Sequence, residues 1–303
     1  MEEIRRLVWD GTLNIEITVD ADLVLADAAE SSRRVFLKVP RDMYLVIYLP
    51  FIVARIQDIL KIDLNDVYQG WWFHFGGTAL DWTQPIGVLY DSLHNHRESM
   101  MGLGDSGRRV EIWKLRLNHS HQYPSGIIPI INGLRQIRHY WMHQWKQACF
   151  ISNGSSKHIM SLSKQEALDF WDSILLRDRK LFRSICDKII ASSQPVKRIP
   201  VKIHLVVGGI RKVKDAAAEG PLSAQYTLGE FIGQQFPEYF PLESAAGGQT
   251  EILMQGIRPS LDLPLDQVYF KLASFDGFLH VLVKVAPSQA CDDMNKITSK
   301  NIC

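Results

Sequence analysis

Residues 72–93 read WFHFGGTALDWTQPIGVLYDSL, and residues 251–272 read EILMQGIRPSLDLPLDQVYFKL. In both segments a glycine is followed eight residues later by a proline and then by an aliphatic residue. Aligned at this constant offset, five positions match: Gly77 with Gly256, Pro85 with Pro264, Ile86 with Leu265, Tyr90 with Tyr269 and Leu93 with Leu272. Repetition of a pattern at a fixed offset indicates a duplicated structural unit. Each copy predicts a strand, a turn at the glycine and a helical turn after the proline.

The elements around the first copy follow from hydrophobic periodicity. Alternating or aromatic-rich runs predict four strands, at residues 13–19, 35–39, 71–75 and 110–117. Helical spacing of Ile52, Ile56, Ile59 and Leu60 predicts one longer helix between the second and third strands. The segment His94–Arg109, rich in Gly, Ser and His, is interpreted as an inserted loop.

The same order returns in the second half of the chain. Strands are predicted at residues 199–207, 251–254 and 278–285. Thr227 and Glu230 match a capping box, which predicts a helix through Phe236. The segment Lys212–Gln225 is interpreted as a mobile connection. One helix packed across a mixed sheet, in this order, is the arrangement of ubiquitin, so the sequence predicts two ubiquitin-like (β-grasp) folds.

The segment between the two copies is predicted to be helical. One helix presents an apolar face made of Leu134, Ile137, Trp141, Trp145 and Cys149. A second helical stretch continues this apolar face over residues 170–189. The fold class is therefore α+β, with two ubiquitin-like domains flanking a helix-rich domain that packs against both.

A lysine stands at the bend between these two helical stretches. Asn153–Ser156 has the residue types of a turn, and Ser163 with Glu166 has the form of a capping box. Because turns lie at the surface, we expect the amine of Lys157 to be exposed. Met160 and Trp171, which lie nearby in the sequence, are predicted to be core residues.

Composition excludes several classes of protein. The net charge of +1 argues against a dedicated nucleic-acid binder. Four scattered cysteines without a C-x-x-C pair fit a reducing compartment and neither a zinc site nor a disulfide framework. The N-terminus lacks the features of a signal peptide, and no apolar run is long enough to span a bilayer. The sequence therefore predicts a soluble, intracellular chain.

Four parts of the chain closely resemble the autophagy protein 5 family. They are Val8–Gly11, Trp72–Leu93, the helical block with NGSSKHIMSLSK, and Gly256–Leu265 leading to Phe278–Val281. The resemblance covers about residues 4–286 and implies two ubiquitin-like domains that flank a helix-rich domain. Together with the repeated pattern, the domains are predicted as an N-terminal segment (1–11), two ubiquitin-like domains (12–122 and 196–286), a helix-rich domain between them (130–193) and a flexible tail (287–303). It says nothing of the His94–Arg109 loop or of the tail.

The resemblance also implies a function. In that family a lysine in or beside the helix-rich domain forms an isopeptide bond with the ubiquitin-like modifier autophagy-related protein 12, and Lys157 matches this acceptor position. E1-like and E2-like enzymes make the bond. The conjugate, with the N-terminal helix of a coiled-coil partner of the autophagy-related protein 16 kind, promotes E3-like transfer of a second ubiquitin-like protein to phosphatidylethanolamine. A cytoplasmic protein recruited peripherally to the pre-autophagosomal membrane is expected, with no catalytic residue, cofactor or metal of its own.

Two histidines and two cysteines are candidates for metal or thiol chemistry. His139 and His143 have zinc-compatible spacing, but Tyr140 stands where H-E-x-x-H needs glutamate, so polar helix-face histidines are favoured. Cys149 and Cys186 are predicted to be inert thiols on apolar faces. A metal- or thiol-dependent hydrolase using His139 and His143 or Cys149 is the alternative function.

Two further expectations concern partners. A groove between the three domains is predicted to accept the amphipathic helix of the coiled-coil partner, although the sequence does not identify its lining residues. Basic clusters at Arg108–Arg109, Lys197–Arg198 and Arg211–Lys214 are ordinarily solvated, and anionic lipid is a weaker interpretation. Lys164 and Lys146 are the nearest competitors of Lys157 as an acceptor.

Overall fold

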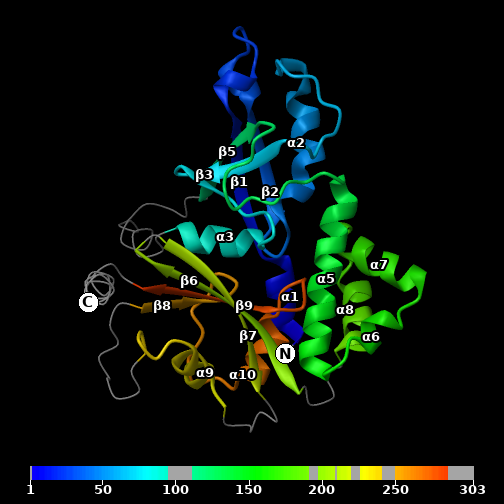
Figure 1. The fold of residues 1–303 in the computed structure, drawn as a ribbon, viewed down its shortest axis with the longest axis vertical. Coiled ribbons are helices and arrows are strands. Elements are labelled where there is room, and N and C mark those ends of the chain that lie inside the picture. Colours follow the sequence, from blue (N-terminus) through cyan, green and yellow to red (C-terminus); the bar gives the residue numbers. More distant parts are fainter. Residues whose placement is uncertain are drawn as a thin grey trace, which may run out of the picture. The chain divides into compact units, whose positions relative to one another are not determined.

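A computed structural model describes residues 2–94, 111–190, 197–208, 210–219, 226–240 and 250–285 (Figure 1). The predicted His94–Arg109 loop after His94 and the tail from residue 286 lie outside these residues. The chain divides into two compact units, one formed by Trp9–Trp141 and the other by residues from Met142 onward together with the N-terminal residues up to Val8. Each unit contains one β-sheet.

The unit Trp9–Trp141 contains a five-stranded mixed sheet. Its strands are β1 (Thr12–Val19), β2 (Arg34–Pro40), β3 (Trp71–Phe75), β4 (Thr78–Ala79) and β5 (Ile112–His119). They lie in the order β2-β1-β5-β3-β4, with β1 parallel to β5 and the other pairs antiparallel. Helices α2 (Leu49–Ile56) and α3 (Ile86–Leu93) complete the fold, along with short 3-10 turns at Ala21–Leu23, Glu30–Arg33, Leu45–Tyr48 and Gln57–Ile59.

Burial alternates along the strands of this first sheet, as the sequence pattern predicts. Ile15, Ile17 and Val19 of β1 are at most 1% exposed, whereas Phe36 of β2, which pairs with Glu16, is 61% exposed. Buried residues of α2 and α3 supply the second layer of the core. Burial of such aliphatic and aromatic side chains is the main favourable contribution to folding.

The second unit contains a four-stranded mixed sheet and the helical block. Its strands are β6 (Arg198–Val207), β7 (Ile210–Glu219), β8 (Thr250–Leu253) and β9 (Leu279–Val285), in the order β7-β6-β9-β8. The central strands β6 and β9 are parallel. Its helices are α5 (Gly133–Asn153, which begins in the first unit), α6 (Lys157–Met160), α7 (Lys164–Leu175), α8 (Arg179–Ile189), α9 (Leu228–Gln235) and α10 (Leu265–Leu272), and α1 (Glu2–Asp10) starts the chain. The predicted fold class is confirmed.

The duplication extends to the backbone of the predicted turns. Gly76 and Gly77 have φ angles of 54° and 83°, and Gln255 and Gly256 have φ angles of 51° and 80°. Phe75 pairs with Thr78 in the first copy, and the equivalent Met254 pairs with Ile257 in the second. Two consecutive residues with positive φ form the turn that matches the twist of a tight hairpin. The helices α3 and α10 follow at the same offset.

The interpretation of Lys212–Gln225 as a mobile connection was wrong for its first part. Residues 210–219 form β7, which pairs along its whole length with β6. The sequence IRKVKDAAAE has no alternation and few residues that favour strands, so periodicity could not reveal it. It forms a strand because β6 offers a long edge and because the hairpin turn at Gly208, with φ of 55°, brings residue 210 back beside Val207.

The helical block differs from the prediction in two places. The second helical stretch is two helices, because Arg177 adopts a left-handed φ of 57° between α7 and α8. Met160 was predicted to be a core residue, but its side chain is 62% exposed and Ile159 takes the buried position. Trp171 is buried, as predicted. No helix in the described part of the chain has the length and apolarity that crossing a bilayer requires.

Helix α5 packs on the second sheet, and this packing accounts for the burial of consecutive residues along β6. Trp145 donates its indole N–H to the Phe275 carbonyl at 2.7 Å. Lys202 of β6 donates to the side-chain oxygen of Gln144, so a lysine on the outer face of a strand is buried. Both contacts are made by α5, which therefore covers this part of the sheet.

Candidate acceptor site at Lys157

The exposed lysine predicted at the bend is the first residue of α6. Helix α5 ends at Asn153, four positions before Lys157. The Gly154 N–H donates to the Phe150 carbonyl at 2.8 Å, and Gly154 has a left-handed φ of 71°. This is the usual glycine-capped end of an α-helix. The N–H of Lys157 donates to Oγ of Ser155 at 3.2 Å, and the residue is exposed.

The segment 154–157, which carries Lys157, is hydrogen-bonded to the end of α8 through the residues on both sides of it. Asn153 donates its amide N–H to the Ile189 carbonyl at 3.0 Å, and Nδ1 of His158 lies 3.2 Å from the same oxygen. Because a carbonyl can only accept, the His158 ring must carry its proton on Nδ1. The Cys149 thiol donates to the Ser155 carbonyl at 3.4 Å. Lys157 is therefore exposed, while the hydrogen bonds of its neighbours hold its backbone in place.

Helices α7 and α8 are braced beside this segment. The predicted capping box is present, with the Glu166 N–H donating to Oγ of Ser163 and the Ser163 N–H donating to the Glu166 carboxylate. The same carboxylate accepts from Lys188 of α8 at 2.6 Å. Lys188, followed by the Ser163 hydrogen bonds, lowers the pKa of Glu166 to about 2. The carboxylate is thus ionised at any physiological pH.

Lys197 lies against the turn at Gly154, a position that the sequence did not predict. The Lys197 N–H donates to the Ser152 carbonyl at 2.8 Å, and its Nζ would be 3.2 Å from a Cβ placed on Gly154. Forty residues separate Lys197 from Lys157 in sequence, so no local pattern could bring them together. Lys197 joins Lys164 and Lys146 as an alternative acceptor to be tested.

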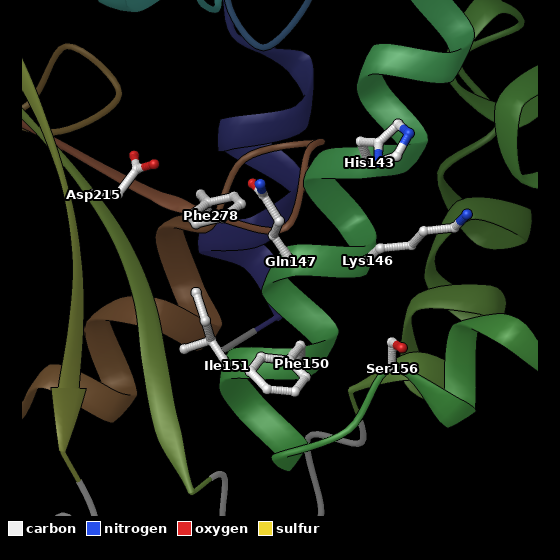
Figure 2. A pocket seen from close by; sticks show the side chains of 8 residues that line it. All are labelled: His143, Lys146, Gln147, Phe150, Ile151, Ser156, Asp215 and Phe278. Carbon is white, nitrogen blue, oxygen red and sulfur yellow. The ribbon is translucent and has the colours of Figure 1, made fainter.

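A hollow of about 340 Å³ lies on the same unit, beside the turn (Figure 2). Figure 2 shows its lining, most of which comes from α5: His143, Lys146, Gln147, Phe150, Ile151, Ser156, Asp215 and Phe278. Phe150 is 60% exposed, and Ser156 directly precedes Lys157. The hollow is formed within one compact unit, so it does not test the predicted groove between three domains.

Comparison with known proteins finds matches over most of the chain. Three family profiles described as Autophagy protein ATG5 match it: the UblA domain at residues 8–118, the alpha-helical bundle region at 134–192 and the UblB domain at 198–283. Autophagy protein 5 of Eremothecium gossypii is 35% identical over 284 residues, which are 93% of this chain and 95% of that protein. The chain belongs to the autophagy protein 5 family.

Two further members of the autophagy protein 5 family are similar to this chain over nearly its whole length. Autophagy protein 5 of Vanderwaltozyma polyspora is 37% identical over 93% of this chain and 96% of that protein. The crystal structure of Kluyveromyces marxianus Atg5 superposes with a TM-score of 0.78 at 33% identity, covering 94% of this chain and all of that chain. Family membership assigns this protein a role in autophagy, and it does not assign a role to Lys157.

Membership in this family gives the hydrolase alternative no support, and neither does the geometry. Among the described residues, no three His, Cys, Asp or Glu side chains gather where they could hold a metal ion. Cys149 and Cys186 are both buried free thiols. Burial raises the pKa of Cys186 well above its ordinary value, so its thiolate, the nucleophilic form, is disfavoured.

Proposed function

We propose that Lys157 accepts an isopeptide bond from a ubiquitin-like modifier of the autophagy-related protein 12 kind. The supporting observation is that one exposed lysine begins α6 in a segment whose two flanks are bonded to α8. An acceptor has to be accessible to a bulky enzyme and yet held in one place, because a mobile amine rarely reaches the attacking geometry. Lys157 meets both conditions.

The proposed reaction is a transfer from a thioester to an amine. A bond forms between Nζ of Lys157 and the carboxyl carbon at the C-terminus of the modifier, and the C–S bond to the E2-like enzyme breaks. The ammonium loses two protons in all, and one of them is taken up by the departing thiolate. Because a lysine amine in water is almost entirely protonated at neutral pH, the E2-like enzyme has to remove the first proton and align the amine.

The conjugate is proposed to act as a scaffold and not as an enzyme by itself. Bound to the N-terminal helix of a coiled-coil partner of the autophagy-related protein 16 kind, it would promote E3-like transfer of a second ubiquitin-like protein to phosphatidylethanolamine. Peripheral recruitment of this assembly to the pre-autophagosomal membrane is part of the proposal. The exposed side chains of Arg198, Lys212 and Lys214 are candidates for weak contact with anionic lipid.

The acceptor is tested by arginine substitution in a reconstituted conjugation reaction. Lys157→Arg keeps the positive charge but removes the usable amine, because a guanidinium does not deprotonate in proteins. We expect the covalent adduct to disappear in this variant and to persist in the matched controls Lys164→Arg, Lys146→Arg and Lys197→Arg. Persistence of the adduct in Lys157→Arg, with loss in one control, would move the acceptor to that lysine.

Partner binding is tested separately from conjugation. A peptide carrying the N-terminal helix of the coiled-coil partner is expected to bind Lys157→Arg and wild-type protein equally, with a negative change in heat capacity because apolar surface is buried. Loss of peptide binding in Lys157→Arg would mean that the lysine has a structural role. Absence of binding by either protein at tens of micromolar would remove the helix-binding part of the proposal.

A further inference from the structure

The carbonyl oxygen of Ile189 accepts two side-chain hydrogen bonds that enclose the acceptor segment. One comes from Asn153, directly before the segment 154–157, and the other comes from His158, directly after it. Ile189 is the last residue of α8, so its carbonyl has no partner within that helix. The two donors thus complete a helix end and close the acceptor segment into a loop with both ends fixed to one atom.

We propose that Asn153 and His158 are positioning residues for the transfer to Lys157, acting as a clamp that sets where the amine points. This inference rests on the proposed acceptor function. It assigns a role in the reaction to two side chains that need not touch the modifier or the E2-like enzyme. No sequence pattern marks Asn153 and His158 as a pair. The atom that they share is a backbone carbonyl 31 residues beyond His158.

The clamp is needed because the local structure cannot hold itself. Helix α6 has four residues, and a helix this short is unstable without tertiary contacts. The turn before it contains Gly154, which has the widest conformational freedom of any residue. Ile159, 5% exposed, anchors the far side of α6. This buried side chain fixes the depth of the helix, and the two hydrogen bonds fix the direction of its first turn.

The pH dependence of the transfer rate distinguishes a clamp from a role of His158 as the base that deprotonates the amine. Nδ1 of His158 donates to a carbonyl, and it carries a proton both in this neutral tautomer and in the imidazolium. A clamp therefore keeps its hydrogen bond in either form of the ring, so the loss on removing His158 does not grow as pH rises. If His158 instead took the proton of the amine, its contribution would fall as the ring became protonated.

The test uses single-turnover transfer from a preformed E2-like thioester to the full-length protein between pH 6 and 8. Asn153→Ala and His158→Ala remove one donor each. His158→Asn keeps an amide N–H close to the position of Nδ1, whereas His158→Gln carries its amide one carbon further out. Gln165→Ala, an exposed residue of α7 whose amide bonds Asp169, is the matched surface control. Lys157→Arg reports on the acceptor itself.

If the clamp operates, each alanine variant loses about tenfold in the rate at saturating thioester, since small misplacement of a reacting group has effects of this order or larger. The concentration for half-maximal rate stays unchanged, and the loss does not grow as pH rises. The double variant is little worse than either single one, because both bonds act on one segment. His158→Asn restores most of the rate and His158→Gln does not.

Hydrogen exchange of the backbone amides of residues 160 and 161 gives a readout independent of the reaction. These N–H groups donate to the Ser156 and Lys157 carbonyls within α6. They are expected to exchange faster in both alanine variants and at the wild-type rate in Gln165→Ala. Unchanged exchange would overturn the clamp whatever the transfer rates.

The outcomes separate the clamp from the acceptor proposal. If Lys157→Arg abolishes the adduct while both alanine variants transfer within twofold of wild type, the acceptor stands and the clamp is wrong. A loss confined to the His158 variants that grows with pH and is not restored by asparagine would identify a base and also overturn the clamp. If Lys157→Arg still forms the adduct, both proposals fail together.

Discussion

Gln255 adopts the same left-handed backbone conformation as Gly76, its counterpart in the other ubiquitin-like domain, with φ angles of 51° and 54°. This conformation costs a residue with a Cβ about 1–2 kcal/mol, and glycine adopts it freely. A Cβ at Gly76 would meet no atom within 4 Å. The two positions therefore differ in side chain and not in backbone geometry.

Exchanging these two residues is expected to move stability in opposite directions. Gln255→Gly should raise the free energy of unfolding by up to about 1 kcal/mol, because relief of the strain exceeds the entropy that glycine adds to the unfolded chain. Gly76→Gln should lower it by a similar amount. Urea unfolding of both variants checks this. A lower stability of Gln255→Gly would show that the hydrogen bond from Gln255 to the Leu272 carbonyl outweighs the strain.

A second expected effect concerns the contact between α5 and the loop before β9. Gly277 has a φ of 84°, and a Cβ there would lie 3.0 Å from both Ala148 and the Trp145 ring. Gly277→Ala is expected to destabilise the protein by about 2–5 kcal/mol, which combines backbone strain with overpacking against α5.

Gly126→Ala is the matched control for Gly277→Ala. Gly126 has a φ of 85°, but a Cβ there would meet nothing within 4 Å. The control should lose only the strain of about 1–2 kcal/mol. Chemical denaturation of both variants isolates the overpacking as the difference between them, and equal losses would contradict the close packing of α5 on this loop.

Acid sensitivity is expected from a buried chain of polar groups in the second ubiquitin-like domain. Nε2 of His204 lies 2.9 Å from Nδ1 of His280, and Nε2 of His280 lies 3.0 Å from the Asp276 carboxylate. Burial, with repulsion from His280, Arg211 and Lys202, holds the pKa of His204 well below its ordinary value. Burial alone would raise the pKa of Asp276, but His280 and Lys202 outweigh it and the net shift is downward.

The sign of the pH effect follows from these directions. Below the ordinary histidine pKa of about 6.5, the unfolded chain binds a proton at His204 that the folded chain refuses, so stability falls as pH falls. The slope approaches about 1.4 kcal/mol per pH unit for one proton. Asp276 adds its own loss only below the ordinary aspartate pKa of about 3.9.

Denaturation of wild-type protein and His204→Gln at pH 7.5, 6.5 and 5.5 tests the acid sensitivity. Glutamine cannot take up the proton, so its stability should depend less on pH over this range. An identical pH dependence in the two proteins would place the titrating group elsewhere.

The sequence predicted those parts of the fold that local signals encode. The bounds of α10 and α3, the capping boxes at Ser163 and Thr227, and the doubled turn all follow from residue types at fixed spacings. Strand β7 was missed because pairing with β6, and not its own composition, makes it a strand. At the candidate site, exposure of Lys157 was predictable from the turn residues. The contacts of Asn153 and His158 with Ile189 and the approach of Lys197 were not, because they join segments 31 to 43 residues apart.

The last prediction concerns the turn that precedes Lys157. Gly154 has a φ of 71°, and the nearest atom to a Cβ there would be Nζ of Lys197 at 3.2 Å. Because that atom is the end of a flexible side chain, the cost of Gly154→Ala should be backbone strain of about 1–2 kcal/mol and little more. Gly154→Asn should lose less, since asparagine tolerates the left-handed conformation better than alanine.

Thermal and urea unfolding of Gly154→Ala, Gly154→Asn and the double variant Gly154→Ala/Lys197→Ala measure this cost. If only backbone strain matters, adding Lys197→Ala will not recover the stability that Gly154→Ala loses. Recovery of more than half of it would show instead that Lys197 is held rigidly over the turn. That result would make Lys197 a fixed neighbour of the segment 154–157, since a side chain that cannot yield to one methyl group is held against the turn.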